Sequence, residues 1–64
     1  MNDYFVISHT TEYDDVVYYN KDKHIWVDIM DKASWFNNKV DALLVCRNDL
    51  YTYINITIIK VGVD

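Results

Sequence analysis

The chain has 64 residues, enough for one domain (1–64) and too few for a second. Ten acidic residues against six basic ones give a net charge of −4, which disfavours binding to nucleic acid or to anionic membranes, because both depend on Lys and Arg contacts to phosphate. A lone cysteine, Cys46, excludes a disulfide framework within the chain, and no apolar stretch approaches the roughly 20 residues that span a bilayer.

Three β-strands are predicted in the first half of the chain, over residues 4–8, 16–19 and 25–29, because these runs are rich in β-branched and aromatic side chains. A polar loop over 9–15 follows the first strand. The tetrad 20–23 is short and polar, so the second and third strands should form a hairpin. Alternation along the third strand divides its side chains between two faces, Ile25, Val27 and Ile29 on one and His24, Trp26 and Asp28 on the other.

After a predicted turn over 31–34, one helix is expected over about 38–48, with Asn37 or Asn38 as its N-cap. Its apolar stripe follows the spacing i, i+3, i+4, i+7 and is widened by neighbouring apolar residues. The stripe comprises Val40, Leu43, Leu44 and Arg47, and the residues that widen it are Ala42, Val45 and Cys46. If this stripe packs on the sheet, Leu44→Ala should cost about 2–5 kcal/mol.

Residues 51–61 carry the strongest β-strand pattern of the chain, and Gly62 should end the strand. Because this segment is so rich in β-branched residues, we expect it inside the sheet and not at an edge. The element order is therefore β-β-β-α-β, an α+β fold with an antiparallel four-stranded sheet and one helix packed on one face. A single helix covers one side only, so the opposite face of the sheet is expected to meet water or a partner.

Catalytic and metal-binding patterns are weak throughout the chain. Cys46 falls in the apolar stripe of the helix, and His9 and His24 have no second ligand at metal spacing. The acidic residues of 12–15, or the pair Asp28 and Asp31, could form a carboxylate dyad or hold a hard cation, but a solvated acidic surface is the preferred interpretation. We therefore predict no enzymatic activity, no cofactor and no bound metal.

Aromatic residues make up 16% of the chain, more than one helix–sheet interface requires, and Tyr and Trp concentrate at protein interfaces. Several aromatic residues lie beside acids, which predicts docking on another protein with a basic surface. The candidate partner-binding residues are Glu12, Tyr13, Asp14, Asp15, Tyr18, Trp26, Asp28 and Tyr53. Under this hypothesis Trp26→Ala spares the fold. Two alternatives stay open: the aromatics fill the core, or the bare sheet face forms a homodimer.

Residues 18–61 also resemble small phage-encoded accessory proteins, among them an inhibitor of bacterial RNA polymerase of similar length and element order. The matching pieces are His24-Ile25-Trp26-Val27, Ala33-Ser34-Trp35-Phe36, Val40-Asp41-Ala42-Leu43-Leu44 and Ile56-Thr57-Ile58-Ile59-Lys60-Val61. No functional residue carries over from that family. The resemblance implies a short phage-derived protein that binds and alters a host enzyme.

These observations predict an acidic protein-binding module that inhibits or modulates a host nucleic-acid enzyme or defence system, partly by placing carboxylates where phosphates would lie. The alternative is a structural module that self-assembles through the uncovered sheet face. The start of the chain lacks a basic region followed by a long apolar run, and the lone Cys46 suits a reducing compartment. We therefore expect the protein in the cytoplasm, that of the host cell if it is phage-derived.

Overall fold

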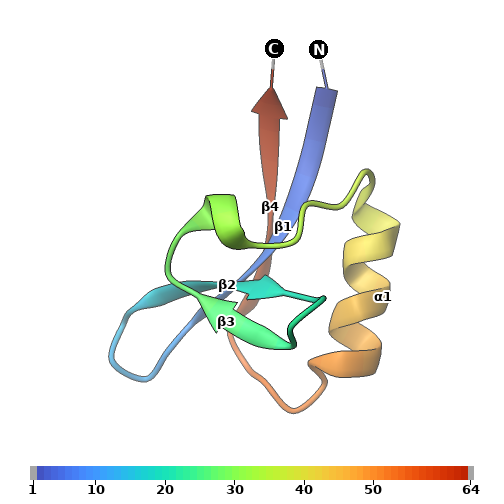
Figure 1. Cartoon of the computed structure of the whole chain (residues 1–64). Coiled ribbons are helices and arrows are strands. Elements are labelled where there is room, and N and C mark those ends of the chain that lie inside the picture. Colours follow the sequence, from blue (N-terminus) through green and yellow to red (C-terminus); the bar gives the residue numbers. More distant parts are fainter. Residues whose placement is uncertain (1, 64) are drawn as a thin grey trace.

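The computed structural model describes residues 2–63, which form four strands, one α-helix and a short 3-10 helix. In chain order the elements are β1 (Asn2–Thr10), β2 (Val16–Asn20), β3 (Ile25–Val27), η1 (Met30–Lys32), α1 (Lys39–Asp49) and β4 (Ile56–Val63). The strands form one antiparallel sheet in the order β3-β2-β1-β4, and α1 packs on it (Figure 1). The α+β class with one helix and a four-stranded antiparallel sheet is thus confirmed. No helix within residues 2–63 is long and apolar enough to cross a membrane.

The last strand lies at an edge of the sheet, so the expectation that it would be internal was wrong. β1 pairs with β4 over its length, from Asn2 with Val63 to His9 with Ile56. A β-branched composition favours a strand but does not decide which neighbours it pairs with. β4 also begins later than predicted and continues through Gly62, because Asn55 takes a left-handed backbone conformation (φ 59°) that interrupts the extended chain before Ile56.

β1 and β2 pair only from Ser8 with Tyr18 to Thr10 with Val16, and the segment 34–36 bonds to both strands beyond that point. Phe36 exchanges two backbone hydrogen bonds with Phe5, at 2.8 and 2.9 Å. The amide of Ser34 donates to the carbonyl of Tyr19 at 2.9 Å, and its hydroxyl accepts from the amide of Lys21 at 2.8 Å. This segment therefore satisfies backbone groups that strand pairing leaves free.

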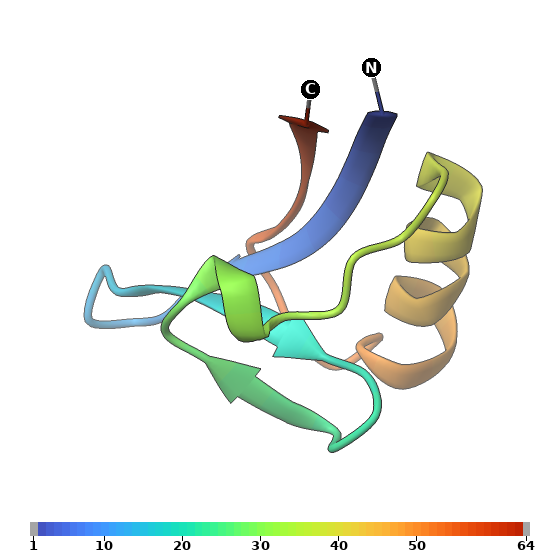
Figure 2. The ribbon, with the colours of Figure 1, turned by 45° about the horizontal axis from the view of Figure 1, so that its top comes forward.

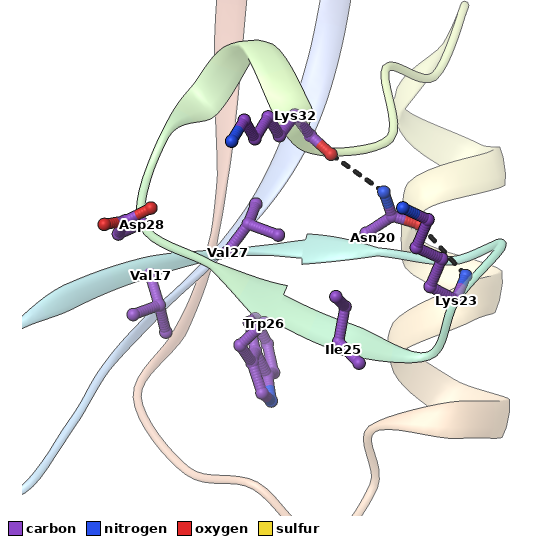
Figure 3. Close-up of a pocket in the computed structure, with 8 residues that line it drawn as sticks. All are labelled: Val17, Asn20, Lys23, Ile25, Trp26, Val27, Asp28 and Lys32. Atoms are coloured by element: carbon purple, nitrogen blue, oxygen red, sulfur yellow. Dashed lines mark hydrogen bonds between the residues drawn. The ribbon is translucent and has the colours of Figure 1, made fainter.

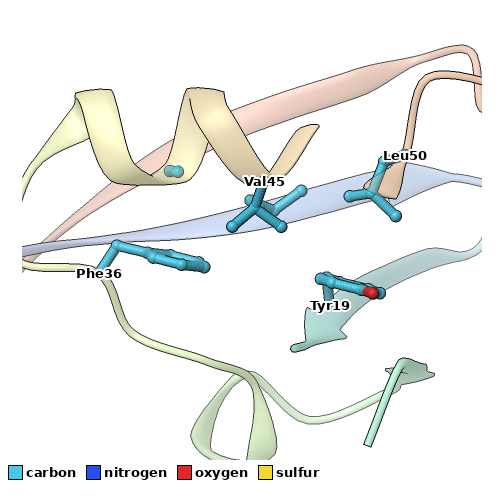
Figure 4. Packing of buried hydrophobic residues seen from close by; sticks show 6 residues of the cluster. Tyr19, Phe36, Val45 and Leu50 are labelled. Atoms are coloured by element: carbon cyan, nitrogen blue, oxygen red, sulfur yellow. The ribbon is translucent and has the colours of Figure 1, made fainter. Parts of the chain in front are cut away.

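The core lies between the helix and the sheet and consists of Ile7, Tyr19, Phe36, Ala42, Val45 and Leu50 (Figure 4). The helix begins as predicted, since the side chain of Asn38 accepts a hydrogen bond from the amide of Asp41 at 2.9 Å.

The predicted contact stripe of the helix was wrong. Val40 is 63% exposed, and Leu43 and Leu44 are each 49% exposed. The helix instead turns Ala42 and Val45 toward the sheet, with Cys46 half-buried beside them. Apolar residues occur on more than one face of this helix, so their spacing could not select the buried face. The small side chain of the fully buried Ala42 allows the helix to approach the sheet closely.

The face of the sheet opposite the helix is also partly covered, which corrects the expectation of a bare face. Side chains alternate along β1, so Val6 and Ser8 point away from the helix side on which Ile7 packs, yet Val6 is fully buried and Ser8 is 5% exposed. The covering chain runs through η1, which contacts β2 (Figure 2). It continues to Trp35, whose ring centroid lies 5.4 Å from that of Tyr4.

The third strand keeps the predicted alternation, but Trp26 lies on the helix side and not on the uncovered face that the docking hypothesis requires. Trp26 pairs with Tyr19 across β2 and β3, and side chains of directly paired residues share a face. Tyr19 belongs to the core, and Trp26 packs against it from the helix side of the sheet. Ile25 and Ile29 are 46% and 48% exposed.

Candidate protein-binding site

A groove of about 580 Å³ lies at the end of the molecule where the loop after β1 meets the loop before β4. Its walls come from the end of β1, from the β1–β2 loop over 11–15, and from the α1–β4 loop over 51–55. The lining residues are His9, Thr10, Thr11, Glu12, Tyr13, Asp15, Val17, Thr52, Tyr53, Ile54 and Asn55. This feature is called the acidic groove below, because none of these residues is Lys or Arg and two are acids.

The β1–β2 loop has a defined conformation that Thr11 organises. The Thr11 hydroxyl accepts from the amides of Tyr13 and Asp15 at 3.3 and 3.2 Å. The Thr11 backbone donates to the carbonyl of Asp15 at 2.8 Å and accepts from the amide of Asp14 at 3.0 Å. Asp14 adopts φ 64°, a conformation that Asp tolerates better than most residues. The loop thereby holds Glu12, Tyr13, Asp14 and Asp15 exposed to solvent.

The opposite wall is attached to the end of β1. The Nδ1 nitrogen of His9 lies 2.8 Å from the carbonyl oxygen of Ile54 and must donate the proton, since a carbonyl only accepts. The Thr10 amide donates to the carbonyl of Asn55 at 3.3 Å. These bonds fix the α1–β4 loop beside the hairpin and leave Ile54 74% exposed and Tyr53 43% exposed.

Aromatic rings connect the groove to the hydrophobic core. His9 contacts Trp26 and Tyr53 at ring-centroid distances of 5.2 and 5.4 Å, and Trp26 contacts Tyr53 edge-on at 5.3 Å. Trp26 then meets the buried ring of Tyr19 at 5.1 Å. The groove therefore has a packed aromatic base, and its tyrosine at position 53 is held in place by ring contacts on two sides.

The charge of the molecule is concentrated at this end. Three of the ten acids occupy the β1–β2 loop, which leaves seven acids against six bases elsewhere in the chain. Within the described residues one ion pair forms, between the Lys60 ammonium and the Asp3 carboxylate at 3.4 Å. Glu12, Asp14 and Asp15 thus set up a local negative potential that no neighbouring Lys or Arg in the groove offsets.

The structure brings together some of the predicted partner-binding residues and separates others. Glu12, Tyr13, Asp15 and Tyr53 all line the acidic groove, and the exposed Asp14 belongs to the same loop.

The remaining three lie apart from the groove. Trp26 does not line the groove and reaches it through its ring contacts with His9 and Tyr53. Tyr18 pairs with Ser8 and so lies on the face of the sheet away from the helix. Asp28 is exposed just after β3 and lines a different hollow.

That second hollow, about 760 Å³, surrounds β3 but is not one binding site (Figure 3). Its lining includes Trp26 on one side of the strand and Val27 and Lys32 on the other (Figure 3). Because the side chains of β3 alternate between the two faces of the sheet, one small ligand could not contact both sets.

Residues with catalytic potential are few in the described part of the chain. Burial raises the pKa of the Cys46 thiol, so little thiolate exists at neutral pH to act as a nucleophile. Burial also raises the pKa of the Tyr19 hydroxyl, with smaller contributions from the Asp49 carboxylate and from Tyr53. Among residues 2–63 no three His, Cys, Asp or Glu side chains gather closely enough to hold a metal ion.

Comparison with known proteins adds no further indication. The chain matches no protein-family model, and no curated protein or solved structure is significantly similar to it.

Seven of the lining residues were not among the sequence candidates, and two of these, Ile54 and His9, form the wall that joins the α1–β4 loop to β1. Ile54 was assigned to the last strand, in alternation with Ile56 and Ile58, and His9 was treated as an isolated imidazole. The signal for Ile54 was Asn55, a residue type that tolerates left-handed backbone, placed between Ile54 and the true start of β4. No local pattern identifies the role of His9, because its partner Ile54 is 45 residues away.

Proposed function

We propose that this protein is a binding module whose acidic groove docks on a basic surface of another protein. The observation that carries the proposal is the joint exposure of apolar and acidic groups in one place. Tyr13, Tyr53 and Ile54 are 79%, 43% and 74% exposed. A soluble domain leaves such side chains together in water mainly where they are used for contact.

The chemistry of the groove selects the kind of partner. Tyrosine gives a large contact area at a small cost in conformational entropy, and its hydroxyl tolerates a wet rim. The carboxylates of Glu12, Asp14 and Asp15 favour a surface rich in Lys and Arg and accelerate the encounter with it. The hydrogen bonds of Thr11 hold the loop before binding, so little ordering cost remains to be paid.

The effect that we propose for the partner is inhibition or modulation. A basic surface on a host nucleic-acid enzyme normally contacts phosphates, and a rigid loop with three carboxylates competes for the same Lys and Arg side chains. On this proposal the protein is phage-derived and acts in the host cytoplasm. Nucleic acid and the protein should then exclude each other from the partner.

The test uses a synthetic peptide rich in lysine and arginine as a probe, titrated into the ¹⁵N-labelled protein. We expect amide shifts confined to residues 11–15 and 52–55, and weaker binding as salt rises. The variant Glu12→Gln/Asp14→Asn/Asp15→Asn should lose about tenfold in affinity, since each exposed charge contributes about 0.5 kcal/mol. Asn is suited to the left-handed backbone at position 14.

A matched control distinguishes the effect of the acids in the groove from the effect of the net charge of the protein. The variant Asp22→Asn/Asp31→Asn/Asp49→Asn removes three exposed acids from elsewhere on the molecule. It should retain the affinity of the parent protein. Equal weakening in both variants, or shifts spread over the whole surface, would show unspecific charge attraction and reject the acidic groove as the binding site.

Self-assembly through the face opposite the helix remains the second candidate, and one observation favours it. The register places Val16 and Ile25 on that face, where they are 47% and 46% exposed. The burial of Val6 and Ser8 beneath the chain's own segment limits the area that is free there. A variant Val16→Lys/Ile25→Lys that remains associated in sedimentation would exclude this face.

A further inference from the structure

The two edges of the sheet differ in how well they are protected from pairing with another strand. β3 is the edge on one side and has only three residues. β4 is the edge on the other side and has eight residues, with an uninterrupted register against β1 and no proline. Proteins usually blunt such edges with short strands, bulges, prolines or charges. By its length β3 is protected, whereas β4 is long and carries one of these devices, the charge of Lys60.

The hydrogen bonds of β1 show which backbone groups of β4 point outward. Phe5 uses both its amide and its carbonyl to bond Phe36, on the side of β1 away from β4. Its partner Lys60 is therefore in a non-hydrogen-bonded pair, and in an antiparallel ladder such pairs alternate with hydrogen-bonded ones. The bond from the Thr10 amide to the Asn55 carbonyl fits this alternation, because it falls where the next hydrogen-bonded pair is expected.

The backbone amides and carbonyls that point to the free edge are therefore those of Ile56, Ile58, Lys60 and Gly62. None of these groups has another backbone hydrogen bond within the described residues. The intervening Thr57, Ile59 and Val61 face β1 with their backbone groups and complete the internal ladder.

We propose that β4 pairs antiparallel with β4 of a second copy of this chain, centred on Ile59. In this register Ile58 lies opposite the partner's Lys60 and Ile56 opposite the partner's Gly62. All four outward residues of each copy are then hydrogen-bonded, and the two sheets become one. This interface is separate from the acidic groove and does not depend on the proposed function.

The side chains favour a second copy as the occupant of the edge. The pattern of outward groups is symmetric about Ile59, so the strand complements itself under a two-fold axis. A register centred on Lys60 would place the two Lys60 side chains directly opposite each other, whereas a register centred on Ile59 places each Lys60 opposite Ile58. Lys60 also has its charge partly balanced by Asp3 in the same chain.

The space beside the edge agrees with this register. Gly62 has no side chain to place against Ile56 on the helix side. A hollow of about 480 Å³ borders Ile56 on that side, and its lining is mostly apolar, with Leu43, Leu50 and Tyr51 beside Arg47. On the other face, the pairs formed by Thr57 with Val61 and by Ile59 with its own copy are β-branched throughout.

The test compares Lys60→Pro with Lys60→Val by sedimentation equilibrium from micromolar to millimolar concentration. Proline removes one outward amide but no bond to β1, and edge positions of this kind tolerate proline. Valine removes the same charge and the same ion pair but keeps the amide. We expect a dimer of twice 7.7 kDa for the parent and for Lys60→Val, and a folded monomer for Lys60→Pro.

An isotope-filtered NMR experiment on a mixture of labelled and unlabelled chains tests the register. We expect a contact between the Hα protons of the two Ile59 residues, because these protons are closest in a non-hydrogen-bonded antiparallel pair. A parent protein that stays monomeric at millimolar concentration, or a dimer that survives in Lys60→Pro, overturns the proposal.

Discussion

The orientation of the helix is tested by comparing two adjacent apolar residues. Val45 is 8% exposed and belongs to the core, whereas Leu44 is 49% exposed. The periodicity of the sequence had favoured Leu44 as the buried residue. Truncating each to alanine therefore separates the observed orientation of the helix from the one predicted by its apolar spacing.

The expected magnitudes follow from the carbon atoms that are removed. Val45→Ala deletes two buried methyl groups at about 0.8 kcal/mol each, and the remaining cavity raises the total to about 2 kcal/mol. Leu44→Ala deletes three carbons that are half in water, which limits the loss to about 1 kcal/mol, and the higher helix propensity of alanine offsets a few tenths of that. A domain of this length has a total stability of about 3–10 kcal/mol.

Urea unfolding followed by tryptophan fluorescence measures both free energies of unfolding. With a slope of about 1 kcal/mol per molar urea, Val45→Ala should lower the midpoint by about 2 M, and Leu44→Ala by less than half of that. The slopes must agree between variants for the comparison to hold. A larger loss for Leu44→Ala than for Val45→Ala would mean that the helix is rotated about its axis, and the reasoning would fail.

Tyr19→Phe should reduce the loss of stability at alkaline pH, because the pKa of the Tyr19 hydroxyl is raised in the fold. The stabilising contribution of this group is complete below the pKa that Tyr19 has in the unfolded chain, and it is lost as pH rises through the pKa that Tyr19 has in the fold. Tyr18→Phe is the control, and equal effects of the two in pH-dependent unfolding would contradict the assignment. Trp26→Ala should destabilise the fold by about 2 kcal/mol, since half-burial gives a part of the 3–5 kcal/mol of a core Trp; unchanged stability by urea unfolding would remove Trp26 from the core. Asn38→Ala should cost about 1 kcal/mol through loss of the N-cap, while Asn37→Ala should change the melting temperature little.

Local signals in the sequence were sufficient for the elements and for the helix start. The runs rich in β-branched residues overlap the four strands, and the predicted hairpin has its turn directly after Asn20. Asn38 caps the helix because a short polar side chain can accept from the first free amides whatever the rest of the chain does. These features depend on residues a few positions apart in the chain, so they can be predicted from a single sequence.

Features that depend on distant residues could not be predicted. Trp26 faces the helix because β3 registers with β2, and a shift of one residue would turn it to the other side. The bonds of Phe36 to Phe5 place a loop between strands, and nothing in the residues 33–36 specifies that position. The same limit applies to the acidic groove: the acids were visible in the sequence, whereas the wall formed by Tyr53 and Ile54 depends on contacts with the end of β1.

The position of the groove relative to β4 connects the two proposals. The groove ends at Asn55, directly before the strand, and a dimer centred on Ile59 places Ile56 of one copy opposite Gly62 of the other. Because Asn55 of one copy then lies opposite Val63 of the other, eight residues of strand separate the ends of the two grooves by about 26 Å along the sheet.

Two acidic sites on one rigid sheet would bind a densely basic surface with avidity, about 10²-fold or more above a single site. Lys60→Pro should then bind a single basic peptide in solution as the parent does, but dissociate much faster from a surface crowded with that peptide. Equal dissociation of parent and variant from the crowded surface would show that the grooves act independently, even if both interfaces exist.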